Sequence, residues 1–146
     1  MKHLNTAVAL SIKSLEGGAF PAGALVVCKD KLISKSTATK FPKINLHPES
    51  KAIDAAMEKQ NSQLSNCVLY SSMQPCLMCL SRAYWAGIRK ITFAIRKEKV
   101  PHSICYESDL DHFELLKNFN EKIEMLHVPK MESEALEIVN NWLKEQ

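Results

Sequence analysis

The chain has 146 residues, of which 46% are hydrophobic and 24% are charged, and its formal net charge is +3. This length and balance predict one globular domain over residues 1–146 with a sizeable core, and they exclude a disordered chain. The charge is too small to indicate nucleic-acid binding by itself. Every uncharged apolar run is too short to span a membrane.

The five cysteines are an odd number without the spacing of a disulfide framework. Such usage is typical of a protein kept in a reducing compartment, so we expect a cytoplasmic localisation. Cys28 and Cys67 lie in apolar, strand-like runs, and we expect both to be small buried residues. The N-terminal apolar run is broken by polar residues and carries a helical stripe at Leu4, Val8 and Ile12, which favours a helix over a signal peptide.

Apolar periodicity and turn residues divide the chain into alternating helices and strands. In chain order, the predicted elements are a helix over 4–16, strands over 25–28 and 31–34, a helix from 48 to 59, a strand over 68–70, a helix from 75 to 87, a strand over 91–95, a helix over 110–119, a strand over 123–128 and a helix over 131–142. This order predicts an α/β fold, a three-layer α/β/α sandwich with one mixed five-stranded sheet.

Two short motifs carry the chemistry. Pro75-Cys76-Leu77-Met78-Cys79 places two cysteines three residues apart, so on a helix their side chains share one face. His47-Pro48-Glu49 adds an imidazole and a carboxylate. Two thiolates and one imidazole match the protein ligands of a catalytic zinc ion whose fourth position is left to water. We therefore predict that His47, Cys76 and Cys79 bind Zn²⁺ and that Glu49 is the catalytic residue that moves protons.

Both motifs are predicted to lie at helix N-termini. Pro48 and Pro75 suit the first position of a helix, where the missing N–H costs nothing. His47 would then cap one helix, with Glu49 in its first turn. The positive ends of the two helices would meet at the metal and favour thiolate over thiol. In sheets of this kind, sites form where the carboxyl ends of strands meet helix N-termini.

Three other interpretations stay open. A Cys-x-x-Cys pair at a helix start also occurs as a thioredoxin-type redox pair, although such a pair has no need of His47 and Glu49. A structural zinc site would need a fourth protein ligand, and none of the other cysteines and histidines stands at ligand spacing. The chain could also be a non-catalytic relative stabilised by zinc, although a purely structural site has no use for Glu49.

The combination of His-x-Glu with Pro-Cys-x-x-Cys is the known signature of zinc deaminases that act on nucleobases. At these residues the chain resembles the cytidine-deaminase-like superfamily, over residues 4–145 and most strongly over 21–95. Pro21-Ala22-Gly23-Ala24-Leu25-Val26-Val27 resembles the strand entry of its purine-directed branch, which holds guanine deaminases and tRNA adenosine deaminases. The Tyr84-Trp85-Ala86 that follows the cysteines resembles guanine deaminases most closely.

This resemblance implies hydrolytic removal of an exocyclic amine from a small molecule, namely a free nucleobase, nucleoside or nucleotide. It implies a Zn²⁺ cofactor and a homodimer. A tRNA substrate is the less favoured alternative, because the closing helix is acidic and a tRNA-binding surface would be basic. A cytosine- or cytidine-type deaminase is a further alternative.

The loops around the two motifs hold the candidates for substrate binding. The resemblance assigns the strand entry at residues 21–24, the loop before His47 and an aspartate of a C-terminal loop to the base pocket. Aromatic side chains in loops could stack on a substrate ring. The predicted substrate-binding residues are Phe20, Ala22, Gly23, Ser36, Pro75, Tyr106, Asp109 and Asp111.

Three positions depart from the pattern of the superfamily. Pro48 replaces the usual alanine, which a helix start tolerates. Gln74 replaces the glutamate that commonly precedes Pro-Cys, which removes a charge near the metal. The loop at residues 36–39 lacks the asparagine with which purine-directed members hold the base.

Overall fold

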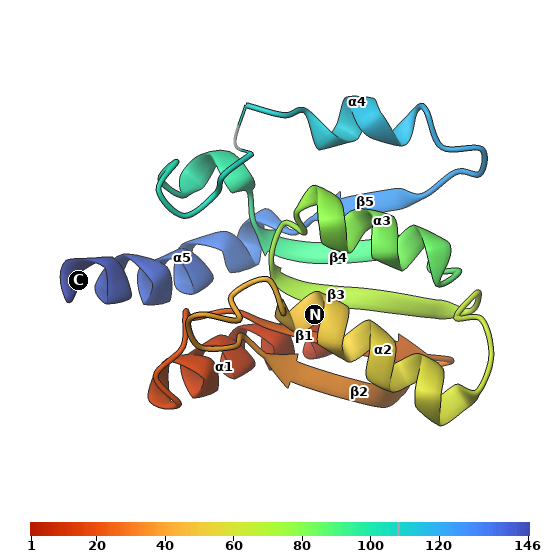
Figure 1. The fold of residues 1–146 in the computed structure, drawn as a ribbon, viewed down its shortest axis with the longest axis horizontal. Coiled ribbons are helices and arrows are strands. Elements are labelled where there is room, and N and C mark those ends of the chain that lie inside the picture. The colour runs from red at the N-terminus through yellow and green to blue at the C-terminus, as the bar shows by residue number, and fades with distance from the viewer. Residues whose placement is uncertain (108) are drawn as a thin grey trace.

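A five-stranded sheet forms the centre of the molecule (Figure 1), which is described by a computed structural model over residues 1–107 and 109–146. The strands are β1 (Gly23–Cys28), β2 (Lys31–Thr37), β3 (Cys67–Met73), β4 (Lys90–Ile95) and β5 (Glu124–His127). The helices are α1 (Lys2–Glu16), α2 (Pro48–Gln60), α3 (Leu77–Trp85), α4 (His112–Leu116) and α5 (Pro129–Lys144), with a short 3₁₀ turn η1 (Lys97–Lys99).

The sheet is mixed and has the order β2-β1-β3-β4-β5. β1 runs antiparallel to β2 and β3, whereas β3, β4 and β5 are parallel to one another. α1 and α5 cover one face and α2 and α3 cover the other (Figure 1). The predicted three-layer α/β/α sandwich with one mixed five-stranded sheet is therefore confirmed.

The two helical layers pack on alternating residues of the same strands. In β1, Ala24 and Val26 point into the core under α2 and α3, whereas Leu25 and Val27 point into the core under α1 and α5. A strand buried on both faces is expected to be apolar throughout, as β1 is. Hydrophobic burial on both sides of the sheet thus holds the layers together.

Left-handed backbone occurs in the turns after α1, β1 and α3. Lys29 and Asp30, with φ of 52° and 63°, form the two-residue turn between β1 and β2, and left-handed backbone at both positions is typical of a type I′ hairpin. Gly18 and Gly87 adopt φ of 84° and 99° after α1 and α3. α2 begins after His47, with Pro48 in its first turn. Pro75, in contrast, lies one residue before the N-cap Cys76, so its predicted place inside the helix is wrong.

The helix predicted over residues 110–119 is shorter in the structure. The side chain of Asp111 caps α4 by accepting hydrogen bonds from the backbone N–H groups of Phe113 and Glu114, at 3.0 and 3.2 Å. Such a cap satisfies N–H groups that have no partner within the helix. α4 therefore starts at His112, and it ends at Leu116.

Cys28 and Cys67 form a disulfide, so the prediction that they are merely small buried residues is wrong. They are direct partners in the antiparallel pairing of β1 and β3, and their Cα atoms lie 4.1 Å apart. Their 39-residue separation hides this pairing in the sequence, because the register of the sheet decides it. The cysteine content consequently gives no argument for a reducing compartment.

None of the helices within the described residues has the length and the apolar character that crossing a membrane requires.

Glu132 ties the start of α5 to the end of β4. Its carboxylate accepts hydrogen bonds from the backbone N–H of Arg96 at 2.9 Å and from the guanidinium of the same residue at 2.9 and 3.1 Å. His127 Nε2 lies 3.2 Å away. The hydrogen bonds from Arg96 lower the pKa of Glu132 to about 2. The folded state is therefore stabilised while this carboxylate is ionised.

We expect Glu132→Gln to lower the free energy of unfolding at pH 7 by about 1 kcal/mol, because a partly exposed, charge-assisted pair loses its negative charge. The contribution is complete above the ordinary carboxyl pKa of 4.5, and it is lost as the pH falls from there towards about 2. Urea unfolding at several pH values should therefore show the two proteins converging in acid. Glu134→Gln, an exposed change on the same helix, is the control and should have little effect at any pH.

Candidate metal centre and active site

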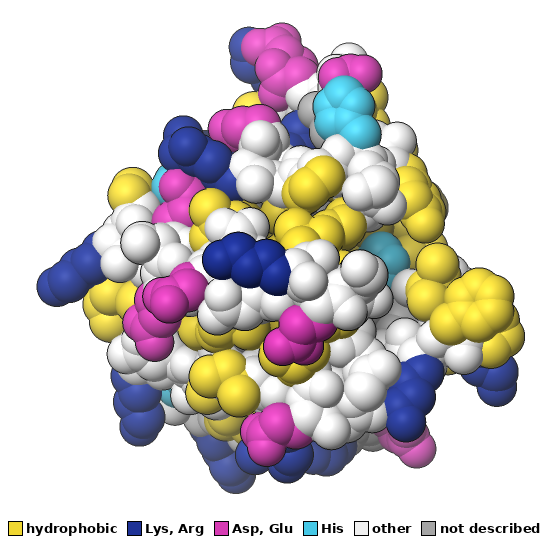
Figure 2. All heavy atoms as spheres, turned by 90° about the vertical axis from the view of Figure 1, so that its left-hand side faces the viewer, with side chains coloured by type: hydrophobic (Ala, Val, Ile, Leu, Met, Phe, Trp, Pro, Cys, Tyr) yellow, Lys and Arg dark blue, Asp and Glu magenta, His cyan; other side chains and the backbone are white. Residues whose placement is uncertain are grey.

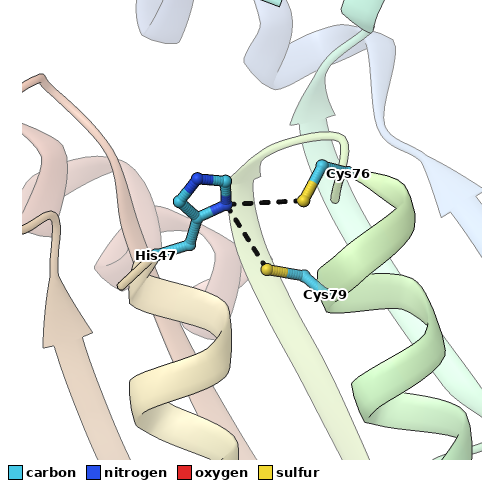
Figure 3. A group of neighbouring side chains, drawn as sticks. All are labelled: His47, Cys76 and Cys79. Carbon is cyan, nitrogen blue, oxygen red and sulfur yellow. Dashed lines mark hydrogen bonds between the residues drawn. The ribbon is translucent and has the colours of Figure 1, made fainter. Parts of the chain in front are cut away.

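His47, Cys76 and Cys79 lie together although their helices are separated in sequence (Figure 3). His47 is the N-cap of α2, Cys76 is the N-cap of α3, and Cys79 lies in the first turn of α3. The Nδ1 atom of His47 is 3.4 Å from the Sγ of Cys76 and 3.5 Å from the Sγ of Cys79. All three ligand atoms are within 4.8 Å of one another, which is compact enough to hold one metal ion.

This set of donor atoms fits zinc in a catalytic site. Two sulfurs and one imidazole are ligands that zinc prefers, and three protein ligands leave a fourth position for water. Among residues 1–107 and 109–146, no fourth histidine, cysteine or carboxylate joins the group, which argues against a closed structural site. Cys76 and Cys79 are both free thiols, with His47 placed against both sulfurs. The position of His47 favours metal binding over a redox pair.

The two thiols differ strongly in acidity because they share a hydrogen bond. The bond that Cys79 donates to Cys76 lowers the pKa of Cys76 to about 4, with a further contribution from His47. The same bond, together with burial, raises the pKa of Cys79. The hydrogen bond to Cys76 raises the pKa of His47. Zinc binds thiolates and neutral imidazole, so metal binding would release protons from this group.

Glu49 lies in the first turn of α2, directly beside the metal ligands. Its side chain is 5% exposed, and Ser71 on β3 donates a hydrogen bond to Oε1 at 2.5 Å. The other oxygen, Oε2, lies 3.8 Å from Cys79 Sγ. Burial raises the pKa of Glu49, and the hydrogen bond from Ser71 opposes that effect. A buried carboxylate beside these three side chains is placed to take up and return a proton.

The strand entry before β1 is used largely for packing. A Cβ atom at Gly23 would lie 2.4 Å from the Cβ of Leu10, so the absence of a side chain allows α1 to approach β1. The N–H of Gly23 donates to Ser72 Oγ at 3.0 Å. Ala22 is buried, and the ring of Phe20 packs edge-on against Trp142 of α5 at 5.0 Å. The ring of Phe20 is therefore engaged by α5, on the sheet face opposite α2.

The other predicted substrate-binding residues are spread around the site. Pro75 is buried next to the ligand Cys76, and Ser36 is half-buried at the end of β2. Tyr106 is 81% exposed. The side chain of Asp109 is 96% exposed, and Asp111 is occupied as the cap of α4. The structure does not bring either aspartate to the metal ligands.

Glu107 is the carboxylate that the loop after β4 does bring to the site, and sequence analysis missed it. Its Oε1 accepts a hydrogen bond from the N–H of Leu77, the first residue of α3, at 2.6 Å. Its charge also contributes to the raised pKa of His47. The sequence analysis instead predicted that Asp109 and Asp111, two other acidic residues that follow β4, bind the substrate. No local pattern shows which acid faces the helix N-terminus.

Ser71 was also missed. Ser71 lies in β3, and its only distinguishing feature in the sequence is that it stands next to Ser72. Nothing in that pair indicates that its hydroxyl contacts the site. Its hydroxyl donates a hydrogen bond to Oε1 of the buried carboxylate of Glu49 and so helps to satisfy it.

The chain matches the family model described as the cytidine and deoxycytidylate deaminase zinc-binding region over residues 1–95. It is 28% identical over 102 residues to a probable cytosine deaminase of Schizosaccharomyces pombe, covering 68% of this chain and 62% of that protein. It is 26% identical to a tRNA-specific adenosine deaminase of Aquifex aeolicus, over 97% of this chain and 91% of the relative. It is 28% identical to a guanine deaminase of Bacillus subtilis, over 86% and 80% of the two chains.

A solved structure of a guanine deaminase from Nitrosomonas europaea has the same fold, with a TM-score of 0.80 and 19% identity, over 96% of this chain and 82% of that chain. The family match covers both motifs and the helices and strands that bring them together. The chain therefore belongs to the cytidine and deoxycytidylate deaminase family of zinc-binding enzymes.

Proposed function

We propose that this protein removes an exocyclic amine hydrolytically from a free nucleobase, nucleoside or nucleotide, with guanine as the first candidate. The observation that carries the proposal is the buried carboxylate of Glu49, held by Ser71 beside a three-ligand metal site. A site that only stabilised the fold would have no need of a buried acid. The relatives named as deaminases of guanine, cytosine and tRNA adenosine support the reaction type but differ in substrate.

His47, Cys76 and Cys79 would hold the zinc ion. When bound, zinc supplies a water of lowered pKa as the nucleophile. Glu49 takes one proton from this water and delivers it to a ring nitrogen of the substrate. Glu49 then carries the second proton to the leaving amine, so that water and the amino compound become the carbonyl compound and ammonia.

The charge pattern supports a small substrate over tRNA. The two arginines that follow α3 and β4 are each paired with a carboxylate, Arg89 with Glu121 at 2.8 Å and Arg96 with Glu132 at 2.9 Å. Figure 2 shows Lys and Arg side chains interspersed with Asp and Glu over the face that it presents, without a continuous basic band. A tRNA-binding surface must follow a phosphate backbone with unpaired positive charge.

Glu107 supports a substrate with N–H donors. A carboxylate only accepts hydrogen bonds when ionised, and this one lies beside the N-terminus of α3 next to the ligand Cys76. A base edge that carries N–H groups, as guanine does, can donate to such an acceptor. Glu107 could thus take a share of the contacts for which the usual asparagine is absent from residues 36–39.

Ammonia release across a panel of guanine, adenine, cytosine, their nucleosides and nucleotides, and tRNA tests the proposal with the zinc-loaded protein. We expect release from at least one small substrate, with guanine the fastest, and little dependence on salt. Release from tRNA alone, with binding that weakens steeply as salt rises, would support the tRNA alternative instead. Glu49→Gln is the matched variant, and it should lower kcat by about 10²–10⁴-fold while zinc stays bound. Unchanged turnover in this variant would remove Glu49 from the mechanism.

The metal requirement has its own test. We expect the wild-type protein to bind one zinc ion per chain and Cys79→Ser to lose it, because a buried sulfur ligand is replaced by a poor one. Metal content after dialysis, measured by elemental analysis, gives the answer. Cys105→Ser is the control, since Cys105 is also a free thiol but is not part of the group, and it should keep its zinc. Equal zinc content in all three proteins would contradict the ligand assignment.

We also propose that the protein forms a homodimer through the outer face of α3. Met78 is 42% exposed and Trp85 is 82% exposed on this face, on either side of Arg82, which pairs with Asp54 of α2 at 2.6 Å. Exposed tryptophan and methionine are enriched at protein interfaces.

Trp85→Glu should therefore shift the protein from dimer to monomer in sedimentation equilibrium, because a charge cannot be buried in an apolar contact. Ile12→Ser is the control: Ile12 is 45% exposed on α1, which covers the opposite face of the sheet. A wild-type protein that sediments as a monomer would refute the dimer.

A further inference from the structure

Two buried polar side chains, Gln74 and His112, are linked by hydrogen bonds to the half-buried Glu107. Gln74 follows the end of β3, and His112 opens α4; the two are 8% and 1% exposed. Gln74 Nε2 lies 3.3 Å from His112 Nδ1, and His112 Nε2 lies 2.7 Å from Glu107 Oε1. Glu107 Oε1 then accepts from the N–H of Leu77 at the start of α3. The mechanism proposed above assigns no role to Gln74 or His112.

In this series of hydrogen bonds, Gln74 donates to His112 and His112 donates to Glu107. The Oε1 atom of Gln74 accepts from the backbone N–H of Lys97 at 3.1 Å, and a backbone N–H can only donate. The amide of Gln74 must therefore turn its NH₂ group towards His112. Nδ1 of His112 accepts, so its ring proton is on Nε2, and that N–H donates to Glu107. The carboxylate of Glu107 receives two donors on Oε1, and within residues 1–107 and 109–146 no hydrogen bond to Oε2 is found.

Gln74 is the residue that makes this direction possible. A glutamate at position 74, which is common in the superfamily, could not donate to Nδ1 of His112. The glutamine thus selects one tautomer of His112 at a distance from the metal. Because His112 is almost fully buried, solvent cannot supply the missing partners.

We propose that Gln74 and His112 are positioning residues, which hold the carboxylate of Glu107 at the N-terminus of α3 as an acceptor for the N–H edge of the substrate. This inference rests on the proposed function, since it assigns the group that selects substrates at the same site. Lys97 contributes to the same arrangement, because its Nζ donates to the backbone carbonyl of Glu107 at 3.3 Å. The selected substrates are amino-heterocycles that present ring or exocyclic N–H groups to Glu107.

The tautomer of His112 is measurable without any turnover. Nitrogen-15 NMR of the zinc-loaded protein, assigned by comparison with His112→Phe, should show an unprotonated Nδ1 and a protonated Nε2. The opposite tautomer would overturn the inference whatever the enzyme's activity. If His112→Phe does not fold, His112→Gln can serve for the assignment, because its amide can still donate to Glu107.

A double-mutant cycle tests the positioning role with the fastest small substrate of the ammonia assay. His112→Phe should lower kcat/KM about tenfold in the wild-type background and less than about twofold in Glu107→Ala, where no carboxylate remains to be positioned. His112→Gln should recover part of the loss. A purely structural role would give equal losses in both backgrounds and would refute the inference.

Different experimental results would refute the proposed function and the positioning role of Gln74 and His112. If the wild-type protein releases ammonia but the losses of kcat/KM caused by His112→Phe and Glu107→Ala are additive, only the positioning role is refuted. If the wild-type protein releases ammonia from no substrate, the proposed function fails, and the positioning role fails with it.

Discussion

The meeting of two helix N-termini at the carboxyl end of β3 is the arrangement on which the rest of the structure depends. α2 brings His47 and Glu49, and α3 brings Cys76 and Cys79. Thiolates and a buried carboxylate are costly to place away from water unless donors and positive potential compensate them. Free N–H groups and helix dipoles provide both at this point, and Ser71 of β3 provides a further donor. The chemistry of the site thus follows from the packing of two helices on one strand.

The loop between β4 and α4 borders the site next to the N-terminus of α3. The parallel part of the sheet places the end of β4 next to the end of β3, with Met73 opposite Ile95, so the chain that leaves β4 passes beside α3. Glu107 reaches the first N–H of α3 from this loop, and His112 connects it to Gln74. In our proposals, metal binding and substrate selection are assigned to different segments of the chain.

The parts of the protein that could be predicted are those with local signals. The short connection between residues 28 and 31, the helix start at His47 and the continuous apolar run of β1 all follow from a few neighbouring residues. The missed contacts join distant positions: Ser71 and Glu49 are 22 residues apart, Leu77 and Glu107 are 30 apart, and Cys28 and Cys67 are 39 apart. Sheet register and loop path create these pairs, and periodicity contains no information about either.

The sequence by itself determined the layered fold, and it pointed to the candidate metal ligands and the acid beside them, because ligand chemistry, helix capping and apolar periodicity are properties of short segments. Only the tertiary structure decided which acidic residue faces the site, which hydroxyl supports Glu49 and that two cysteines of neighbouring strands are joined. The physical reason is that buried polar groups must find partners wherever the packed layers place them. That placement depends on the whole chain at once.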